Sequence, residues 1–143
     1  MILIGPGVFK TRPYVIEDFS SELYLKLKMA QAQAMFDQTV IRFSVLSDQY
    51  HFSHLSQKMN SNKQTWLPFS KTKAFRPTNF PKLITLDLST PFKSSFIDLF
   101  PSGEITPFTL QIMDSSQNKV TSTIEGELSG DIKWQQNNER LQK

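Results

Sequence analysis

The order of hydrophobic and polar positions divides the chain into a helical first part and a strand-rich remainder. From Val15 onward, apolar residues recur at intervals of three and four, which places them on one stripe of an α-helix. This stripe consists of Ile16, Phe19, Leu23, Leu27, Ala30 and Ala34. Acidic residues lie in its early turns and Lys26 and Lys28 follow, which is the order that the helix dipole favours. We predict a helix that ends between Asp37 and Thr39, with the small alanines near its end allowing close packing.

After the predicted helix the apolar period changes from 3.6 to two. Ile41, Phe43 and Val45 alternate with polar residues, and Tyr50 and Phe52 follow a short polar turn, which predicts a hairpin. Further short strands are predicted around these positions: Trp66, Leu67 and Phe69; Ile84, Leu86 and Leu88; residues 95–100; Phe108, Leu110 and Ile112; Val120, Ser122 and Ile124; and Leu128, Ile132 and Trp134.

One N-terminal helix followed by about seven or eight short antiparallel strands is an α+β plan. The 143 residues, 38% of them hydrophobic, fit a single domain with a real core. Pro6 and Pro13 oppose a helix before them, so residues 1–13 are expected to form a lead-in or the remnant of a removed membrane helix. Residues 14–134 then form the globular domain. The polar residues 135–143 are expected to form a flexible tail.

The composition excludes several classes of protein. The chain has no cysteine, which excludes a disulfide framework, thiolate metal sites and a cysteine nucleophile. No run of about 18 apolar residues is present, so we expect no bilayer-spanning segment within this sequence. The apolar stretch at residues 1–5 is too short for the hydrophobic region of a signal peptide.

Residue patterns typical of an active site are weak. His51 and His54 are three apart on a predicted strand, so they point to opposite faces and cannot share one metal ion. Glu125 and Glu127 would share a strand face, but exposed glutamates are usually solvated. Neither a Gly-x-Ser-x-Gly nucleophile elbow nor a phosphate-binding loop occurs. We predict no enzyme, no cofactor, no metal and no small-molecule substrate.

A basic segment is the one site-like feature. The net charge is +3, and between Asp48 and Asp87 there is no acidic residue. The cations in this interval are Lys58, Lys63, Lys71, Lys73, Arg76 and Lys82, with Trp66, Phe69, Phe75 and Phe80 interleaved. Such a segment can grip phosphates and stack its aromatic rings on exposed bases. In the alternative interpretation it is a solvated loop whose aromatic side chains turn into the core.

The apolar stripe of the helix also has two interpretations. Its C-terminal half is expected to cover the sheet. Its N-terminal half is expected to project beyond the sheet and contact neighbouring subunits, because helices that share an apolar seam associate in this manner. The predicted partner contacts are Tyr14, Val15, Ile16, Phe19 and Leu23.

Residues 97–108, IDLFPSGEITPF, resemble a hallmark of the H-type minor pseudopilins (the GspH/FimT group). In that family a strand ending in an aromatic residue meets a Pro-x-Gly turn and a Thr-Pro-Phe return strand. The matching residues are Phe100, Pro101, Ser102, Gly103, Thr106, Pro107 and Phe108. The segment TIEGELSGDIKW, which ends at Trp134, is similar to the family's closing strands, and residues 23–42 are similar to its helix and first strand. The resemblance covers roughly residues 15–134.

The resemblance implies a pseudopilin fold, in which a helix packs on a two-sheet antiparallel β-fold. It also implies the periplasmic domain of a bacterial protein anchored in the inner membrane by an N-terminal hydrophobic helix. The family's leader-peptidase site, with a glutamate at the fifth mature position, does not occur in this sequence. We therefore expect the membrane helix to lie upstream of these residues.

Three functions remain open. The first is a structural minor pseudopilin of the type II secretion pseudopilus, assembling near its tip with other minor and major pseudopilins; the turn motif is closer to this group. The second is a FimT-like minor type IV pilin that binds DNA for uptake. Its phosphate contacts would be Lys58, Lys63, Lys71, Lys73 and Arg76. The third is an enzyme or carbohydrate-binding module in which Trp66 and Trp134 stack on sugars, which two isolated tryptophans support poorly.

Overall fold

A computed structural model describes residues 13–57, 64–69 and 72–137. One long helix, one short 3-10 helix and nine strands lie in this part of the chain. In chain order they are α1 (Pro13–Asp37), β1 (Ile41–Val45), β2 (Gln49–Gln57), β3 (Gln64–Pro68), η2 (Lys73–Phe75), β4 (Thr78–Asn79), β5 (Ile84–Ser89), β6 (Phe96–Leu99), β7 (Phe108–Asp114), β8 (Lys119–Gly126) and β9 (Ile132–Gln136). The α+β prediction is confirmed. The strand count is slightly higher than predicted, because the two residues of β4 are too few to show an alternating pattern.

Helix α1 ends where the sequence predicts, and it begins at Pro13, which the prediction had placed in the lead-in. Proline suits its first position, Pro13, because the missing N–H would have no partner within the helix there. The helix ends at Asp37, where Gln38 takes a left-handed conformation with φ 52°. The N–H of Thr39 then donates to the carbonyl of Ala34 at 3.1 Å, which is the closing bond of a Schellman motif. Each residue of the predicted apolar stripe, from Ile16 to Ala34, is buried.

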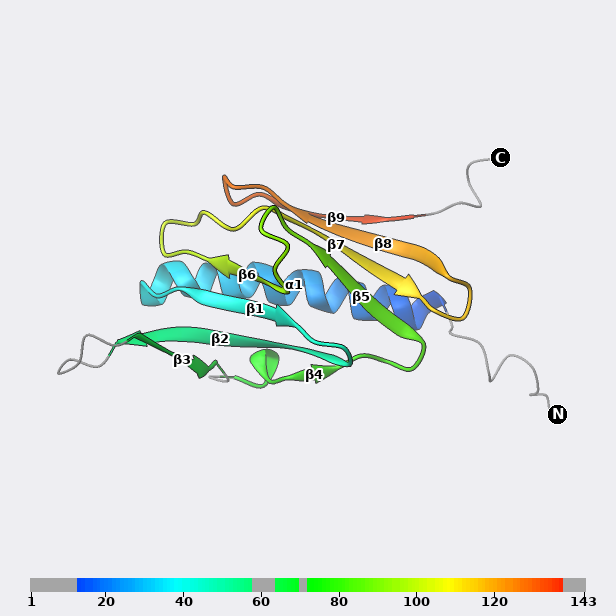
Figure 1. Cartoon of the computed structure of the whole chain (residues 1–143), viewed down its shortest axis with the longest axis horizontal. Helices are drawn as coiled ribbons and strands as arrows, with labels where there is room; N and C mark the ends of the chain where they lie inside the picture. Colours follow the sequence, from blue (N-terminus) through cyan, green and yellow to red (C-terminus); the bar gives the residue numbers. More distant parts are fainter. Residues whose placement is uncertain (1–12, 58–63, 70–71, 138–143) are drawn as a thin grey trace.

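The strands form two antiparallel sheets that lie side by side over one side of α1 (Figure 1). The first has the order β3-β2-β1-β6, with β4 also paired to β2, and the second has the order β5-β7-β8-β9. Helix α1 contacts β1 and β6 of the first sheet and β7, β8 and β9 of the second. The helix therefore joins the two sheets through a single core.

Aromatic side chains fill the part of the core under the first sheet. The ring of Phe43 lies 5.5 Å from that of Tyr50 and 5.3 Å from that of Phe52. The cluster continues from Phe52 to Phe75, whose ring centres are 5.4 Å apart, and from Phe75 to Phe69, whose ring centres are 5.0 Å apart. The alternation of β1 explains why these rings meet, since its residues 41, 43 and 45 all point inward.

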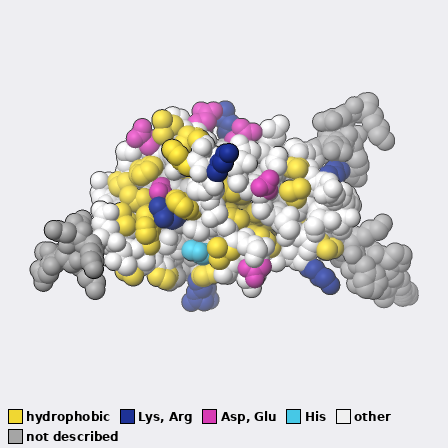
Figure 2. Space-filling model, viewed as in Figure 1, with side chains coloured by type: hydrophobic (Ala, Val, Ile, Leu, Met, Phe, Trp, Pro, Cys, Tyr) yellow, Lys and Arg dark blue, Asp and Glu magenta, His cyan; other side chains and the backbone are white. Residues whose placement is uncertain are grey.

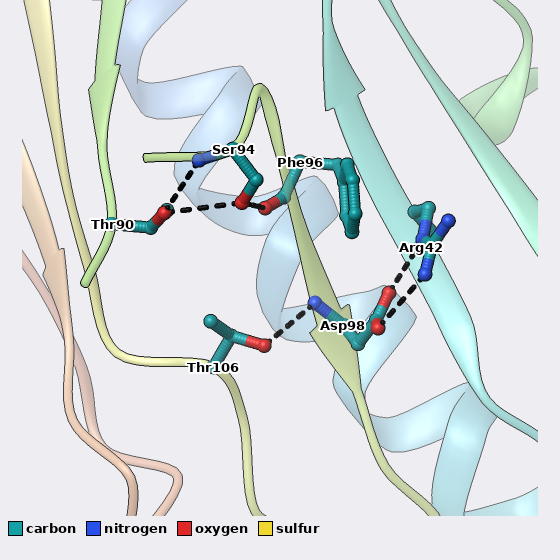
Figure 3. A network of polar contacts seen from close by, with 6 residues as sticks. All are labelled: Arg42, Thr90, Ser94, Phe96, Asp98 and Thr106. Carbon is teal, nitrogen blue, oxygen red and sulfur yellow. Dashed lines mark hydrogen bonds and ion pairs between the residues drawn. The ribbon is translucent and has the colours of Figure 1, made fainter. Parts of the chain in front are cut away.

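The predicted turn motif forms a closed connection between β6 and β7. The N–H of Gly103 donates to the carbonyl of Phe100 at 2.9 Å, and Gly103 has φ 95°, which favours glycine. Thr106, in the segment that leads to β7, then forms hydrogen bonds with β6. Its N–H donates to the carbonyl of Asp98 at 2.9 Å, and its hydroxyl accepts from the N–H of Asp98 at 3.1 Å (Figure 3). Phe108 is buried in the core.

Gln31 holds this turn and the β8–β9 turn against the C-terminal half of α1. Its side-chain amide donates to the carbonyl of Gly103 at 3.1 Å and to that of Gly130 at 2.7 Å. The two turns touch, because a Cβ on Gly130 would lie 2.3 Å from the carbonyl oxygen of Gly103. Gly130 also has φ 104°. Glycine is therefore required at this position both by conformation and by space.

Two boundaries differ from the prediction. Strand β9 continues to Gln136, since Gln135 and Gln136 pair with Thr123 and Ser122, so the expected tail begins later than residue 135. Leu128 is not in a strand; it lies in the turn before β9 with 58% of its surface exposed. The predicted lead-in, apart from Pro13, lies outside the described residues, as do residues 138–143. Among the described helices, none is long and apolar enough to cross a membrane.

Truncation of Leu27 tests the central role of the buried stripe. Leu27 is fully buried, so Leu27→Ala should lower the free energy of unfolding by about 2–5 kcal/mol through lost apolar contact and a cavity. Leu25→Ala is the matched control, because Leu25 lies on the same helix with 54% of its surface exposed and should cost about 0.5 kcal/mol or less. Urea unfolding of both variants measures the difference. Equal effects would contradict the assigned orientation of the helix.

Removal of the Gln31 side chain tests the docking of the two turns. Gln31→Ala removes two hydrogen bonds to backbone carbonyls, and the expected loss of stability is about 1–3 kcal/mol. Gln33→Ala is the matched control, since the Gln33 amide donates to Asp37 of the same helix, a pair worth only about 0.2–0.5 kcal/mol. Thermal unfolding and amide hydrogen exchange at Gly103 and Gly130 are the measurements. Unchanged exchange at both glycines in Gln31→Ala would refute this role.

Candidate interaction surface

The predicted partner contacts on the first half of α1 lie inside the chain's own core. Ile16, Phe19 and Leu23 are 6%, 5% and 0% exposed, which contradicts the prediction that they face a neighbouring subunit. The reason is that the helix runs along both sheets and does not project beyond them within the described residues (Figure 1). Val15 is half-buried, and the side chain of Tyr14 lies outside the described part.

The outward side of α1 carries a different set of residues. Leu25, Met29 and Phe36 are 54%, 47% and 84% exposed, which is unusual for large apolar side chains on one helix. They belong to a row of exposed residues spaced alternately by four and three, which we call the outer seam: Asp18, Glu22, Leu25, Met29, Ala32 and Phe36. Alternating intervals of four and three are those by which two helices keep contact along their length.

A groove runs beside the first part of the outer seam. Its volume is about 590 Å³, and it lies between α1 and the short helix η2. The lining residues are Asp18, Ser21, Glu22, Leu25, Lys26 and Met29 from α1, with Lys73 and Ala74 from η2. The lining combines the apolar residues Leu25, Met29 and Ala74 with two carboxylates and a lysine from α1 and a second lysine from η2.

Lys26 is fixed beside this groove. It is 8% exposed, and its Nζ donates to the hydroxyls of Tyr50 and Thr78, both at 3.3 Å. Nζ also lies 3.6 Å from a carboxylate oxygen of Glu22 and 5.5 Å from the centre of the Tyr50 ring. A buried ammonium needs such partners because its desolvation is costly. These contacts join α1 to the first sheet and to the segment that follows η2.

The aromatic residues of the basic segment are largely turned inward. Phe69 and Phe75 are 5% and 3% exposed and pack in the aromatic cluster, and Phe80 packs on Phe19 with their ring centres 6.2 Å apart. The interpretation that these rings serve the core is confirmed for Phe69 and Phe75, so they cannot stack on bases. Of the predicted phosphate contacts, Lys73 and Arg76 are exposed. Lys58, Lys63 and Lys71 lie outside the described residues.

Trp66 belongs to a stacked cluster on the outer face of the first sheet. The guanidinium of Arg42 lies 3.9 Å from the Trp66 ring centre and 3.8 Å from that of Phe96. Asp98 holds the same guanidinium through two hydrogen bonds, at 2.8 and 3.1 Å (Figure 3). Apolar side chains gather on this face over the first sheet (Figure 2). Arg42 therefore covers one face of the Trp66 ring.

Ser94 and Thr90 order the connection that leads into β6. The N–H of Ser94 donates to the hydroxyl of Thr90 at 3.1 Å, and the hydroxyl of Ser94 donates to the carbonyl of Phe96 at 2.9 Å (Figure 3). These bonds fix the entry of β6 and therefore the position of Phe96 against Arg42. The second tryptophan, Trp134, packs on Tyr24 with ring centres 6.0 Å apart.

The two histidines are separate, as predicted. His51 and His54 are three apart on β2, which places them on opposite faces of the sheet, and the ring of His54 packs on Phe69 at 5.6 Å. No cluster of three or more His, Asp or Glu side chains that could hold a metal ion occurs among the described residues.

Sequence comparison alone does not place the chain, because neither a family model nor a curated protein matches it. Comparison of structures does find similar proteins. The minor pseudopilin EpsH from the type II secretion system of Vibrio cholerae is 16% identical in sequence, with a TM-score of 0.70. That match covers 84% of this chain and 94% of EpsH.

Two further solved structures agree with this match. GspH of Escherichia coli is 12% identical with a TM-score of 0.67, over 87% of this chain and 89% of GspH. The type IV minor pilin FimU of Pseudomonas aeruginosa is 14% identical with a TM-score of 0.56, over 83% of this chain and 91% of FimU. The chain therefore has the pseudopilin fold, the fold of H-type minor pseudopilins and minor type IV pilins.

Proposed function

We propose that the chain is a structural minor pseudopilin of a type II secretion system, which assembles near the tip of the pseudopilus and acts in protein export across the outer membrane. The observation that carries the proposal is the likeness to EpsH over 94% of that protein's length. The FPSGEITPF turn, held by Gln31, adds a motif of the same group. The partners are other minor and major pseudopilins. The domain lies in the periplasm, anchored in the inner membrane by a helix upstream of these residues.

The proposal assigns no reaction to the chain, and several buried polar side chains are engaged in holding the fold. The hydroxyl of Ser20 donates to the carbonyl of Ile16 at 2.8 Å and lies 2.7 Å from the hydroxyl of Ser122. The carboxylate of Asp114 accepts from the N–H of Ser116 at 2.9 Å and orders the β7–β8 turn. These bonds connect α1 to β8 and order a turn.

Deletion of the gene in the source bacterium tests the export function. We expect the exported enzymes of that bacterium to accumulate in the periplasm and to fall at least tenfold in the medium, because the pseudopilus lacks one of its subunits. Immunoblots of medium and periplasm give the measurement, and a plasmid copy of the full gene is the control that should restore export. Normal export in the deletion strain would reject the secretion role.

A second candidate function is DNA binding by a minor type IV pilin. The observation that favours it is the acid-free interval from residue 49 to 86, in which Lys73 and Arg76 are exposed and make no ion pair with a described residue. The proposed phosphate contacts are Lys58, Lys63, Lys71, Lys73 and Arg76. The likeness to FimU is compatible with this function but weaker, with a TM-score of 0.56.

Charge reversal in the basic segment tests the second candidate. Duplex DNA is titrated at several salt concentrations, and binding through this segment should weaken with salt at a slope of about −0.9 per phosphate contacted. Lys71→Glu with Lys73→Glu should abolish binding. Lys133→Glu, a reversal at an exposed lysine of β9, is the control and should leave most of it. The absence of binding to the unaltered chain at low salt would exclude this function.

A further inference from the structure

Strand β9 is the last strand of the second sheet, and one of its two edges is open in the part of the chain that the structure describes (Figure 1). On its other edge, the N–H of Asn137 donates to the carbonyl of Thr121 at 2.8 Å, and the carbonyl of Asp131 accepts from the N–H of Glu127 at 2.9 Å. Residues of an antiparallel ladder bond to the same neighbour at every second position. The register of β8 and β9 therefore turns the backbone groups of the intervening residues away from β8: Ile132, Trp134 and Gln136.

These three residues form a row of backbone donors and acceptors that no described residue satisfies. At about 3.4 Å per residue, the row is roughly 14 Å long. Trp134 lies at its centre. The buried indole Nε1 of Trp134 also lacks a hydrogen-bond partner among the described residues. The described fold thus supplies an acceptor for neither N–H group of Trp134.

The edges of the first sheet are blocked at positions where β9 is open. On β6, both backbone groups of Asp98 bond to Thr106, and the carbonyl of Phe96 accepts from the hydroxyl of Ser94. On β3, the register with β2 turns Pro68 outward, and proline has no N–H to donate. Such features protect an edge from pairing with another chain.

Strand β5 has a shorter open row than β9. Its register with β7 turns Ile84, Leu86 and Leu88 outward, but the N–H of Ile84 donates to the carbonyl of Pro81 at 3.0 Å. Two positions are left with both backbone groups unpaired among the described residues. Strand β9 therefore offers the longest open row in the described part of the chain.

We propose that β9 binds an extended segment of another protein, which adds to the second sheet as a further antiparallel or parallel strand. This inference names the contact by which the chain fulfils the assembly role proposed above, and it rests on that role. Backbone N–H and C=O groups at intervals of two residues match the backbone of another strand. An α-helix uses its own backbone groups internally and cannot satisfy such a row.

The side chains of β9 define the pattern of the incoming segment. On the inner face, Ile132 is buried and Trp134 is half-buried, with its ring packed on Tyr24. On the outer face, Lys133 and Gln135 are exposed. Because side chains alternate between the faces of a strand, the segment alternates apolar residues inside with polar residues outside.

A second copy of this chain fits the edge less well. A closed pair of copies joins two antiparallel β9 strands about a two-fold axis. Centred on Trp134, that pair places each Ile132 opposite a Gln136. Only Trp134 then meets an apolar residue across the strands, whereas a segment with an apolar residue at every inner position covers both Ile132 and Trp134.

The first test uses a seven-residue peptide of alternating threonine and valine and follows amide hydrogen exchange of the full chain by NMR. In the free chain, the amides of residues 132, 134 and 136 should exchange at least tenfold faster than those of Lys133 and Gln135, which face β8. The peptide should slow exchange at the three edge amides at least tenfold. Unchanged exchange there, or protection at Leu86 and Leu88 of β5 alone, would overturn the proposal.

Two N-methylated forms of the peptide show whether its backbone makes the contact. Methyl groups on the valine nitrogens block the row of N–H groups that faces β9 in an antiparallel strand, and those on the threonine nitrogens block the row that faces it in a parallel strand. One form should therefore bind at least tenfold more weakly than the other. Equal binding of the two forms would contradict strand addition.

Gln136→Pro removes one outward N–H and leaves the bonds between β9 and β8 in place, because Gln136 faces away from β8. It should weaken peptide binding at least tenfold. Gln136→Ala is the matched control, since it keeps the N–H and should bind within twofold of the unaltered chain. Urea unfolding should show that both variants are folded. A dimer in sedimentation velocity that Gln136→Pro abolishes would assign the edge to a second copy and overturn the proposal.

Export in the deletion strain separates this inference from the proposed function. A gene copy with Gln136→Pro should restore export at least tenfold less well than a copy with Gln136→Ala. Full export with Gln136→Pro in a strain whose export depends on the gene would refute the strand partner and leave the assembly role standing. Normal export without any copy of the gene would reject the assembly role itself.

Discussion

The packing of one face of α1 against both sheets is the interaction on which the rest of the structure depends. The two sheets share no ladder in the described residues, and the helix is the element that both cover. Fully buried leucines lie at the middle of its buried face and fully buried alanines at its end. The small alanines let the backbone approach the strands closely there. Loss of this contact would expose the inner faces of both sheets.

The same helical repeat that buries one face of α1 leaves the other face exposed. Leu23 and Leu27 are fully buried, while Leu25, between them, is 54% exposed. Gln31 lies at the boundary between the two faces and binds the turns that carry Gly103 and Gly130. A residue at the edge of the buried face can reach backbone carbonyls that no apolar side chain could satisfy. The turn motif is therefore held against the C-terminal half of α1 and helps to shape that end of the domain.

The likeness to EpsH and GspH at 12–16% identity shows that this fold depends on a pattern of burial more than on particular residues. Some glycine positions do require their residue type. Gly126 is an example, since a Cβ there would lie 2.2 Å from the ring of Phe108. In the basic segment, Phe69 and Phe75 serve as volume in the core.

The sequence by itself determined the helix and its C-terminal end, most of the strands, the turn at Pro101 to Gly103 and the fold class. These features rest on local periodicity and turn chemistry, which need no knowledge of distant contacts. Only the tertiary structure decided which face of α1 the two sheets leave uncovered. Ile16, Phe19 and Leu23 were predicted to meet a partner but are covered by strands far along the chain. The pairing of Arg42 with Trp66 and Asp98, and the joint role of Gln31, likewise depend on long-range register, which a single sequence does not specify.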